Sequence, residues 1–116
     1  MRLALVTLVV AAILGACSTA TPAPTPSPMP IPPEAAASVD AAKQAAVTHL
    51  GVTPDQLQVS QVEARQWPDS SLGCPQPGQL YSQIVTPGFL VMLTSGAHQL
   101  EYHTDMRNRV VLCHET

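Results

Sequence analysis

Aromatic and charged residues are scarce in this sequence of 116 residues. Aromatic side chains make up 3% of it and charged side chains 11%, so the chain can build only one modest core, and multi-domain enzymes are excluded. Five Lys and Arg residues stand against eight Asp and Glu, giving a formal net charge of −3 with no basic cluster. A nucleic-acid binder needs a basic patch that neutralises phosphates, so we exclude nucleic acid as a partner.

No motif of a known catalytic centre is present. The sequence has no phosphate-binding loop, dinucleotide fingerprint, Cys-x-x-Cys pair or paired-carboxylate arrangement. Ser70 and Ser71 stand near Asp69, but no nucleophile elbow or glycine-rich oxyanion loop surrounds them. His98 and His103 are five residues apart in one expected strand, so their side chains point to opposite faces and cannot share an ion. We therefore expect no enzyme, no metal site and no cofactor.

The N-terminus has the pattern of an export signal. Arg2 precedes an apolar run of twelve positions, residues 3–14, which is shorter than the roughly 20 residues that a membrane-spanning helix needs. We interpret residues 1–16 as a signal peptide that is removed. Leu14-Gly15-Ala16-Cys17 resembles the lipobox of bacterial lipoproteins, and this resemblance implies that Cys17 is lipidated and becomes the first mature residue. The alternative is a soluble secreted protein that is cleaved near Ala16 or Ala20.

A proline-rich segment follows the lipobox cysteine. Seven of the twelve prolines lie in residues 20–33, where they favour extended polyproline II backbone. We interpret residues 17–33 as the lipidated cysteine and a stalk that holds the rest of the chain up to roughly 50 Å from a bilayer. The expected location is therefore outside the cytoplasm, on the periplasmic face of a membrane or on the cell surface.

The remaining residues, 34–116, read as one small domain that begins with a helix. Alanine-rich residues 34–50 place apolar side chains at helical spacing. Thr53-Pro54-Asp55 is typical of a capped single helical turn, and residues 57–65 then read as the first strand. The alternation in that strand slips between Val59 and Val62, which predicts a β-bulge.

The last third of the chain predicts a three-stranded meander. Phe89, Val91 and Leu93 alternate on one face, Ser95-Gly96 offers a tight turn, and residues 100–104 alternate after it. A final strand is expected over residues 110–113. The predicted fold class is α+β: one N-terminal helix packed on an antiparallel sheet of about four strands, with a long disulfide-tethered loop.

Two cysteines remain if Cys17 carries lipid. Cys74 and Cys113 form an even pair in a compartment where disulfides persist, so we predict a bond between them. The closed loop of about forty residues would add on the order of 4 kcal/mol of stability. The alternative, a reactive thiol beside His114, needs one of these cysteines to stay reduced.

The segment before the meander carries a resemblance. Residues 67–78 read Trp-Pro-Asp-Ser-Ser-Leu-Gly-Cys-Pro-Gln-Pro-Gly, and Tyr81, Pro87-Gly88-Phe89, Tyr102-His103-Thr104-Asp105 and Cys113 follow. Over residues 35–113 the chain resembles an uncharacterised small domain of exported bacterial proteins and lipoproteins, and this resemblance implies no function. The order of helix and strands is also loosely similar to PepSY-type domains, which have no counterpart of the loop.

The loop of residues 67–89 is the predicted binding surface, because its prolines and its half of the disulfide stiffen it. In a purely structural interpretation, Trp67, Leu72 and Tyr81 fold back to fill the open edge of a thin sheet, and Asp69 caps the turn through Ser71 backbone amides. The candidate binding residues in the loop and the neighbouring hairpin are Trp67, Asp69, Gln76, Gln79, Tyr81, Gln83, Phe89, Tyr102 and His103.

The function that these features favour is a non-catalytic, membrane-anchored binding or display module of the cell envelope. The expected partners are the membrane, through the lipid anchor, and an envelope protein or a glycan. The alternative function is a protease inhibitor, because a rigid tethered loop is pre-organised to occupy an active-site cleft.

Overall fold

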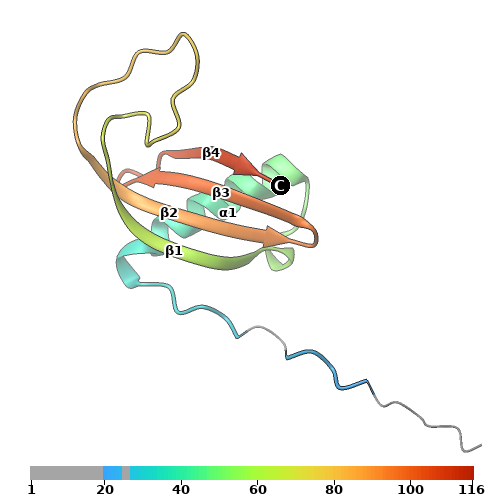
Figure 1. Ribbon diagram of the computed structural model, residues 1–116. Helices are drawn as coiled ribbons and strands as arrows, with labels where there is room; N and C mark the ends of the chain where they lie inside the picture. Colours follow the sequence, from blue (N-terminus) through green and yellow to red (C-terminus); the bar gives the residue numbers. More distant parts are fainter. Residues whose placement is uncertain (1–19, 25–26) are drawn as a thin grey trace, which may run out of the picture.

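The computed structural model describes residues 20–24 and 27–116. The expected signal peptide of residues 1–16 and the lipidation site Cys17 lie outside the described residues. Residues 27–32 form no helix or strand and lead away from the domain (Figure 1). Pro32, at the end of this segment, has φ −56° and ψ 138°, which is polyproline II geometry. Within the described ranges, no helix is both long and apolar enough to cross a membrane.

The domain consists of one long helix and a four-stranded antiparallel meander in the order β1-β2-β3-β4. Helix α1 lies across one face of the sheet (Figure 1). This arrangement confirms the predicted α+β fold. In chain order the elements are η1 Pro33–Ala35, α1 Ala36–Leu50, η2 Pro54–Gln56, β1 Gln58–Trp67, β2 Thr86–Ser95, β3 His98–Asp105 and β4 Val110–Glu115.

Local sequence signals explain where the helical segments begin and end. Gly51 ends α1 in the left-handed conformation at φ 67°, and its N–H donates to Val47 O, which is a conformation that glycine adopts without strain. The Thr53 N–H donates to Gln56 Oε1 over 3.0 Å and so caps η2. The capped turn expected after the helix is therefore present.

The strand register confirms the expected bulge and extends the expected strands. The β1–β2 pairing shifts between Val59 and Gln61, which is where the alternation of the sequence slips. Strand β1 continues to Trp67 because that residue pairs with Thr86, so β2 starts before Phe89. At Gly88 the strands approach so closely that a Cβ atom would lie 1.8 Å from Thr104 O, and only glycine fits there.

The main core fills the space between α1 and one face of the sheet. Tyr102 lies in this core with its hydroxyl buried and without a hydrogen-bond partner among the described residues. Burial raises the pKa of Tyr102, and the nearby Glu115 carboxylate adds to that shift. The buried members of the core are Ala35, Val39, Ala42, Ala46, Leu57, Phe89, Val91, Leu93, Leu100 and Tyr102.

A second, smaller core lies on the opposite face of the same sheet. Trp67 and Leu90 project from the sheet, and Leu72 packs on them from the loop between β1 and β2, with Met92 and Val111 at the margin. The sheet is therefore covered on both faces, by the helix on one and by part of the loop on the other.

Candidate functional site

The loop of residues 68–85 joins β1 to β2 and is clamped at its base. The Ser70 N–H donates to Ser82 O over 3.0 Å, and the Ser82 N–H donates to Ser70 Oγ over 2.8 Å. Arg109, which directly precedes β4, also donates a hydrogen bond from its guanidinium to Ser70 O. The Asp69 carboxylate accepts the Ser71 N–H over 2.8 Å, as the structural interpretation expects. Hydrogen bonds from the Ser71 side chain and then its backbone hold the pKa of Asp69 below its usual value.

The first limb of the loop, residues 68–76, folds onto the sheet. Leu72 and Gly73 adopt left-handed backbone at φ 58° and 75°, and this reversal drives the fully buried Leu72 side chain inward. At Gly73 a Cβ atom would lie 3.3 Å from the Trp67 ring, so the backbone passes directly over the indole. The next residue, Cys74, is bonded to Cys113 of β4. The predicted disulfide is therefore confirmed, and it ties this limb to an edge strand.

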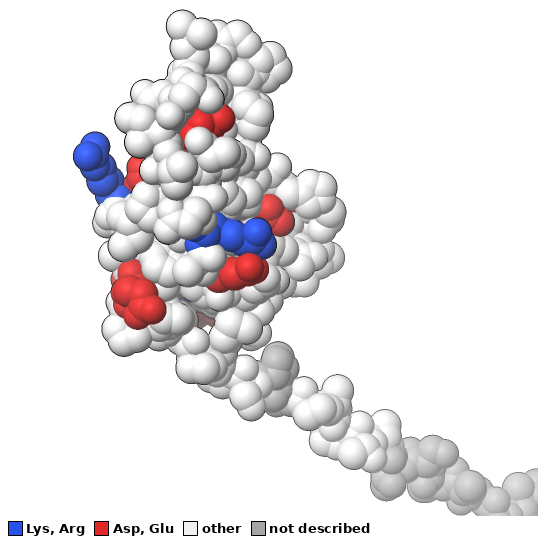
Figure 2. Space-filling model, turned by 60° about the vertical axis from the view of Figure 1, so that its left-hand side comes forward, with Lys and Arg blue, Asp and Glu red and all other residues white. Residues whose placement is uncertain are grey.

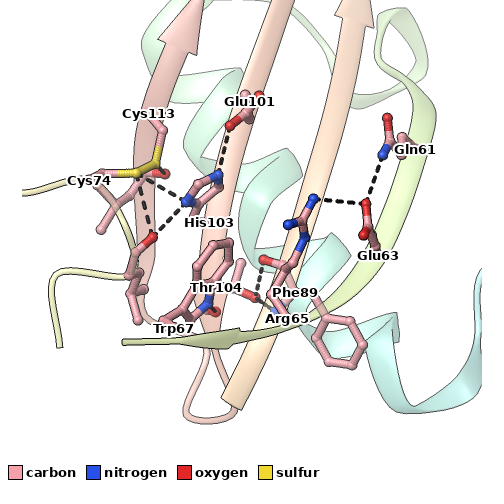
Figure 3. Close-up of polar contacts among 12 residues, drawn as sticks. Gln61, Glu63, Arg65, Trp67, Cys74, Phe89, Glu101, His103, Thr104 and Cys113 are labelled. Atoms are coloured by element: carbon pink, nitrogen blue, oxygen red, sulfur yellow. Dashed lines mark hydrogen bonds and ion pairs between the residues drawn. A yellow bond between two sulfur atoms is a disulfide. The ribbon is translucent and has the colours of Figure 1, made fainter. Parts of the chain in front are cut away.

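His103 lies at the centre of the contacts beneath the first limb (Figure 3). Its ring stacks on Trp67, with centroids 4.2 Å apart and an interplanar angle of 16°. Nδ1 lies 2.6 Å from Leu72 O and 3.1 Å from Cys74 Sγ, while Nε2 lies 2.7 Å from Glu101 Oε1. A carbonyl oxygen only accepts hydrogen bonds, so Nδ1 is the donor in the contact with Leu72 O.

Four of the nine candidate binding residues are buried. Trp67 and His103 lie beneath the first limb, whereas Phe89 and Tyr102 lie beneath α1. In this structure these four side chains are therefore not part of an accessible surface. Their alternation in the strands directs them into one core or the other.

The other five candidate residues lie in the loop outside both cores. Asp69 and Tyr81 are half-buried, and the Tyr81 hydroxyl accepts the Gln76 N–H over 2.8 Å. Gln76, Gln79 and Gln83 are exposed. The three glutamines are therefore accessible on the loop, apart from the buried aromatic residues.

The second limb, residues 77–85, exposes large apolar side chains that sequence reasoning missed. Leu80 is 98% exposed, Ile84 67% and Val85 64%, and Met106 of the β3–β4 turn is 55% exposed. Their signal in the sequence was the presence of leucine, isoleucine and valine in a polar loop. In Figure 2 the part of the surface above the sheet is almost entirely white, and Asp69 is the only charged residue between Trp67 and Phe89.

A hollow of about 650 Å³ lies between the second limb and the β3–β4 turn. Arg107 lines it and makes no ion pair with any residue of the described ranges. Asp105 on the same turn accepts the backbone N–H groups of Arg107 and Arg109 over 2.8 and 2.9 Å. The hollow therefore combines an apolar rim with one available cation. The residues that line it are Ser70, Ser82, Ile84, Val85, Thr86, Pro87, Asp105, Met106, Arg107 and Arg109.

One cluster among the described residues has the side-chain types of a metal site. Cys74, His103 and Cys113 each bring one ligand atom within 4.8 Å of the others. Both sulfurs are joined in the disulfide, however, so neither is available as the thiolate that binds a metal. In this oxidised state the cluster offers a single imidazole.

A comparison with protein families identifies the family of this domain. A family profile described as a domain of unknown function, DUF8738, matches residues 39–113. The chain belongs to the DUF8738 family. The DUF8738 match runs from α1 to Cys113, so it includes the whole loop and both cysteines of the disulfide, and it confirms the expectation of an uncharacterised domain. No curated protein and no solved structure matches the chain.

Proposed function

We propose that this protein is a non-catalytic, lipid-anchored lipoprotein of the cell envelope, and that its DUF8738 domain binds a partner protein through the second limb of the loop and the β3–β4 turn. The observation that carries the proposal is the set of exposed apolar side chains on these two segments: Ile84, Val85 and Met106 line the 650 Å³ hollow, and Leu80 is exposed on the same limb of the loop. Exposed apolar side chains gathered in one place are a common mark of a protein interaction site.

The way the loop is held supports a binding role for this surface. The Ser70–Ser82 clamp and the disulfide fix the base of the loop, so a partner meets side chains that are already in place. Pre-organisation of this kind lowers the entropy cost of association. Arg107, which makes no ion pair within residues 20–24 and 27–116, adds a charged contact that favours a partner segment with apolar side chains and a carboxylate.

The burial of the aromatic side chains favours a protein over a glycan. A glycan site offers flat aromatic faces on which sugar rings stack. Three of the four aromatic residues, Trp67, Phe89 and Tyr102, are buried, and the fourth, Tyr81, is half-buried and accepts a hydrogen bond from Gln76. The exposed surface instead consists of aliphatic side chains, which suit a protein partner.

Photocrosslinking in the native envelope tests the binding surface. A photoreactive residue at Ile84 of the full-length protein should give a discrete protein adduct, whereas the same residue at the exposed Thr48 of α1 should give none. Introducing Ile84→Asp beside a crosslinker at Val85 should lower the adduct yield about tenfold, as expected for an interface centre. Because Ile84 is exposed, its substitution should leave the melting temperature unchanged. Equal adducts from Ile84 and Thr48 would refute the proposed surface.

The membrane anchor has a separate test. The intact mass of the mature protein should correspond to a chain that starts at Cys17 and carries added acyl mass. A Cys17→Ser variant should lose that mass and appear in the soluble fraction. A wild-type chain without acyl mass would contradict the anchor but would leave the binding surface to be judged by its own experiment.

A second candidate function, protease inhibition, rests on Leu80. Its side chain is 98% exposed and stands two residues after Gly78 and beside Tyr81, whose hydroxyl is bound by Gln76. A fully presented leucine on a braced loop is suited to enter the specificity pocket of a protease that prefers large apolar residues. Stoichiometric inhibition of such a protease, abolished by Leu80→Asp and retained in Gln44→Ala, would support this function. Cleavage after Leu80 without inhibition would exclude it.

A further inference from the structure

We propose that the Cys74–Cys113 disulfide is a thiol–disulfide exchange site that takes electrons from dithiols, with His103 stabilising the Cys74 thiolate that leaves. The contact that carries the proposal is the 3.1 Å approach of His103 Nδ1 to Cys74 Sγ. A disulfide that only staples two segments needs no polar partner at its sulfurs. Here a ring nitrogen faces one of the two sulfur atoms (Figure 3).

The surroundings of His103 fix the orientation of its ring and make Nδ1 a hydrogen-bond donor. Leu72 O accepts from Nδ1, and Nε2 lies 2.7 Å from the Glu101 carboxylate. The Glu101 side chain is 29% exposed. Across the sheet on β1, Glu63 is held by Arg65 at 3.1 Å. Glu101 is therefore the one carboxylate in contact with the ring among the described residues.

The contact makes the two sulfur atoms inequivalent. A thiolate is stabilised by a nearby hydrogen-bond donor, and the better stabilised sulfur is the better leaving group in disulfide exchange. The ring contacts Cys74 Sγ, and no contact from its nitrogens to Cys113 Sγ is present. Cys74 is therefore the leaving sulfur, and Cys113 is the sulfur that an incoming thiolate attacks.

The position of the bond allows this attack. Both cysteines are half-buried rather than enclosed, and Cys113 belongs to β4, an edge strand of the sheet. His103 and Trp67 lie beneath the first limb. A thiol can thus approach from solvent while the activating ring stays shielded from water.

The exchange step balances with a dithiol as reductant. A dithiol thiolate attacks Cys113 Sγ, the Cys74–Cys113 bond breaks, and Cys74 leaves as a thiolate that shares with Leu72 O the hydrogen bond donated by Nδ1. The second thiol of the reductant then loses its proton and attacks the mixed disulfide, which releases the Cys113 thiolate. The dithiol is oxidised by two electrons to a disulfide, and the cystine is reduced to two thiols that take up the two protons.

The rate of reduction by dithiothreitol tests the role of His103 in the full-length chain. Quenched alkylation followed by mass measurement counts free thiols, and Trp67, the single tryptophan, reports the same step by fluorescence because it stacks on His103. His103→Gln should lower the second-order rate constant at neutral pH at least about tenfold. The matched control His114→Gln, on the exposed part of β4, should leave it unchanged.

The identity of the leaving sulfur separates activation from a merely structural role. When the oxidised wild-type chain reacts briefly with a monothiol and the free thiols are then alkylated, the mixed disulfide should lie on Cys113 and the alkyl group on Cys74, whereas in His103→Gln both cysteines should carry each group. The same distribution in the two proteins would overturn the proposal.

Glu101→Gln provides a second variant in case His103→Gln does not fold. It removes the carboxylate that lies 2.7 Å from Nε2 while keeping an amide oxygen in its place, so the ring is held less firmly and we expect reduction to slow about threefold. Equal reduction rates in wild type, Glu101→Gln and His114→Gln would overturn the proposal even without the His103 variant.

Discussion

The disulfide should contribute a large part of the stability of this domain, and its removal allows a quantitative test. The bond joins residues separated by 39 positions. In the chain-entropy model a loop of that length removes about 13 cal/mol/K from the unfolded chain, or about 4 kcal/mol at room temperature. Small domains have total stabilities of only about 5–15 kcal/mol. The double variant Cys74→Ala/Cys113→Ala should therefore fold only marginally.

The expected shift in melting temperature follows from the size of the domain. With an unfolding entropy of about 2 cal/mol/K per residue, residues 34–116 unfold with about 170 cal/mol/K. Dividing about 4 kcal/mol by this entropy predicts a melting temperature roughly 20 °C lower. Circular dichroism of the oxidised wild type, the double alanine variant and a Cys17→Ala control measures it. A decrease below about 5 °C would refute the reasoning, because it would place the contribution of the bond below about 1 kcal/mol.

Three further substitutions test individual features of the fold. Gly88→Ala places a Cβ atom 1.8 Å from Thr104 O, so β2 and β3 must separate, and urea unfolding should show a loss of about 3 kcal/mol or more. Tyr102→Phe removes a hydroxyl that is buried without a partner, so stability at neutral pH should stay equal or rise by up to about 1 kcal/mol. Because burial raises the pKa of Tyr102, wild-type stability is complete below about pH 10 and falls as the pH rises through the folded-state value, and the phenylalanine variant should lack this alkaline loss. Asp69→Ala removes a carboxylate whose pKa is lowered by hydrogen bonds from the Ser71 side chain and then its backbone. The variant should therefore be less stable than wild type above about pH 4. Unfolding measured as a function of pH should show that the difference in stability vanishes at lower pH.

Periodicity and turn chemistry predicted most of the fold. The helix was expected over residues 34–50 and is present as η1 Pro33–Ala35 followed by α1 Ala36–Leu50. The bulge near Val59 followed from a slip in alternation, and it is present because the sheet face under α1 accepts only apolar side chains. The pairing of Cys74 with Cys113 followed from counting cysteines, since lipidation of Cys17 would leave a single pair.

The structural interpretation of the loop correctly expected Trp67 and Leu72 to pack on the sheet, but it placed them at the open edge and not in a second core on a face, because only half of one strand pattern was used. Phe89, Val91 and Leu93 alternate and point to the helix, but Leu90 and Met92 between them are also apolar. An unbroken apolar run indicates a strand that is covered on both faces. If the apolar run of β2 had been interpreted in this way, a segment packing on the second face would have been required, and the loop was the available segment.

The roles of Trp67 and His103 could not be predicted from local sequence. Both depend on the left-handed backbone at Leu72, which directs the first limb of the loop over the sheet. Leucine has no intrinsic preference for that conformation. The indole stacks on the imidazole only after residues 36 positions apart are brought together, so their joint burial is a property of the tertiary fold.

The division of the loop into two limbs explains how one segment can serve both stability and binding. A four-stranded sheet that is covered by a single helix exposes Leu90 and Trp67 unless something packs on them, and in a chain with four aromatic residues that loss would be large. The first limb meets this need through Leu72 and the disulfide, so substitutions there act on folding. The large apolar side chains of the second limb are not buried in this way, and Leu80 and Ile84 remain exposed. A change at Leu80 or Ile84 therefore tests binding without disturbing the fold, whereas a change at the buried His103 acts beneath the first limb.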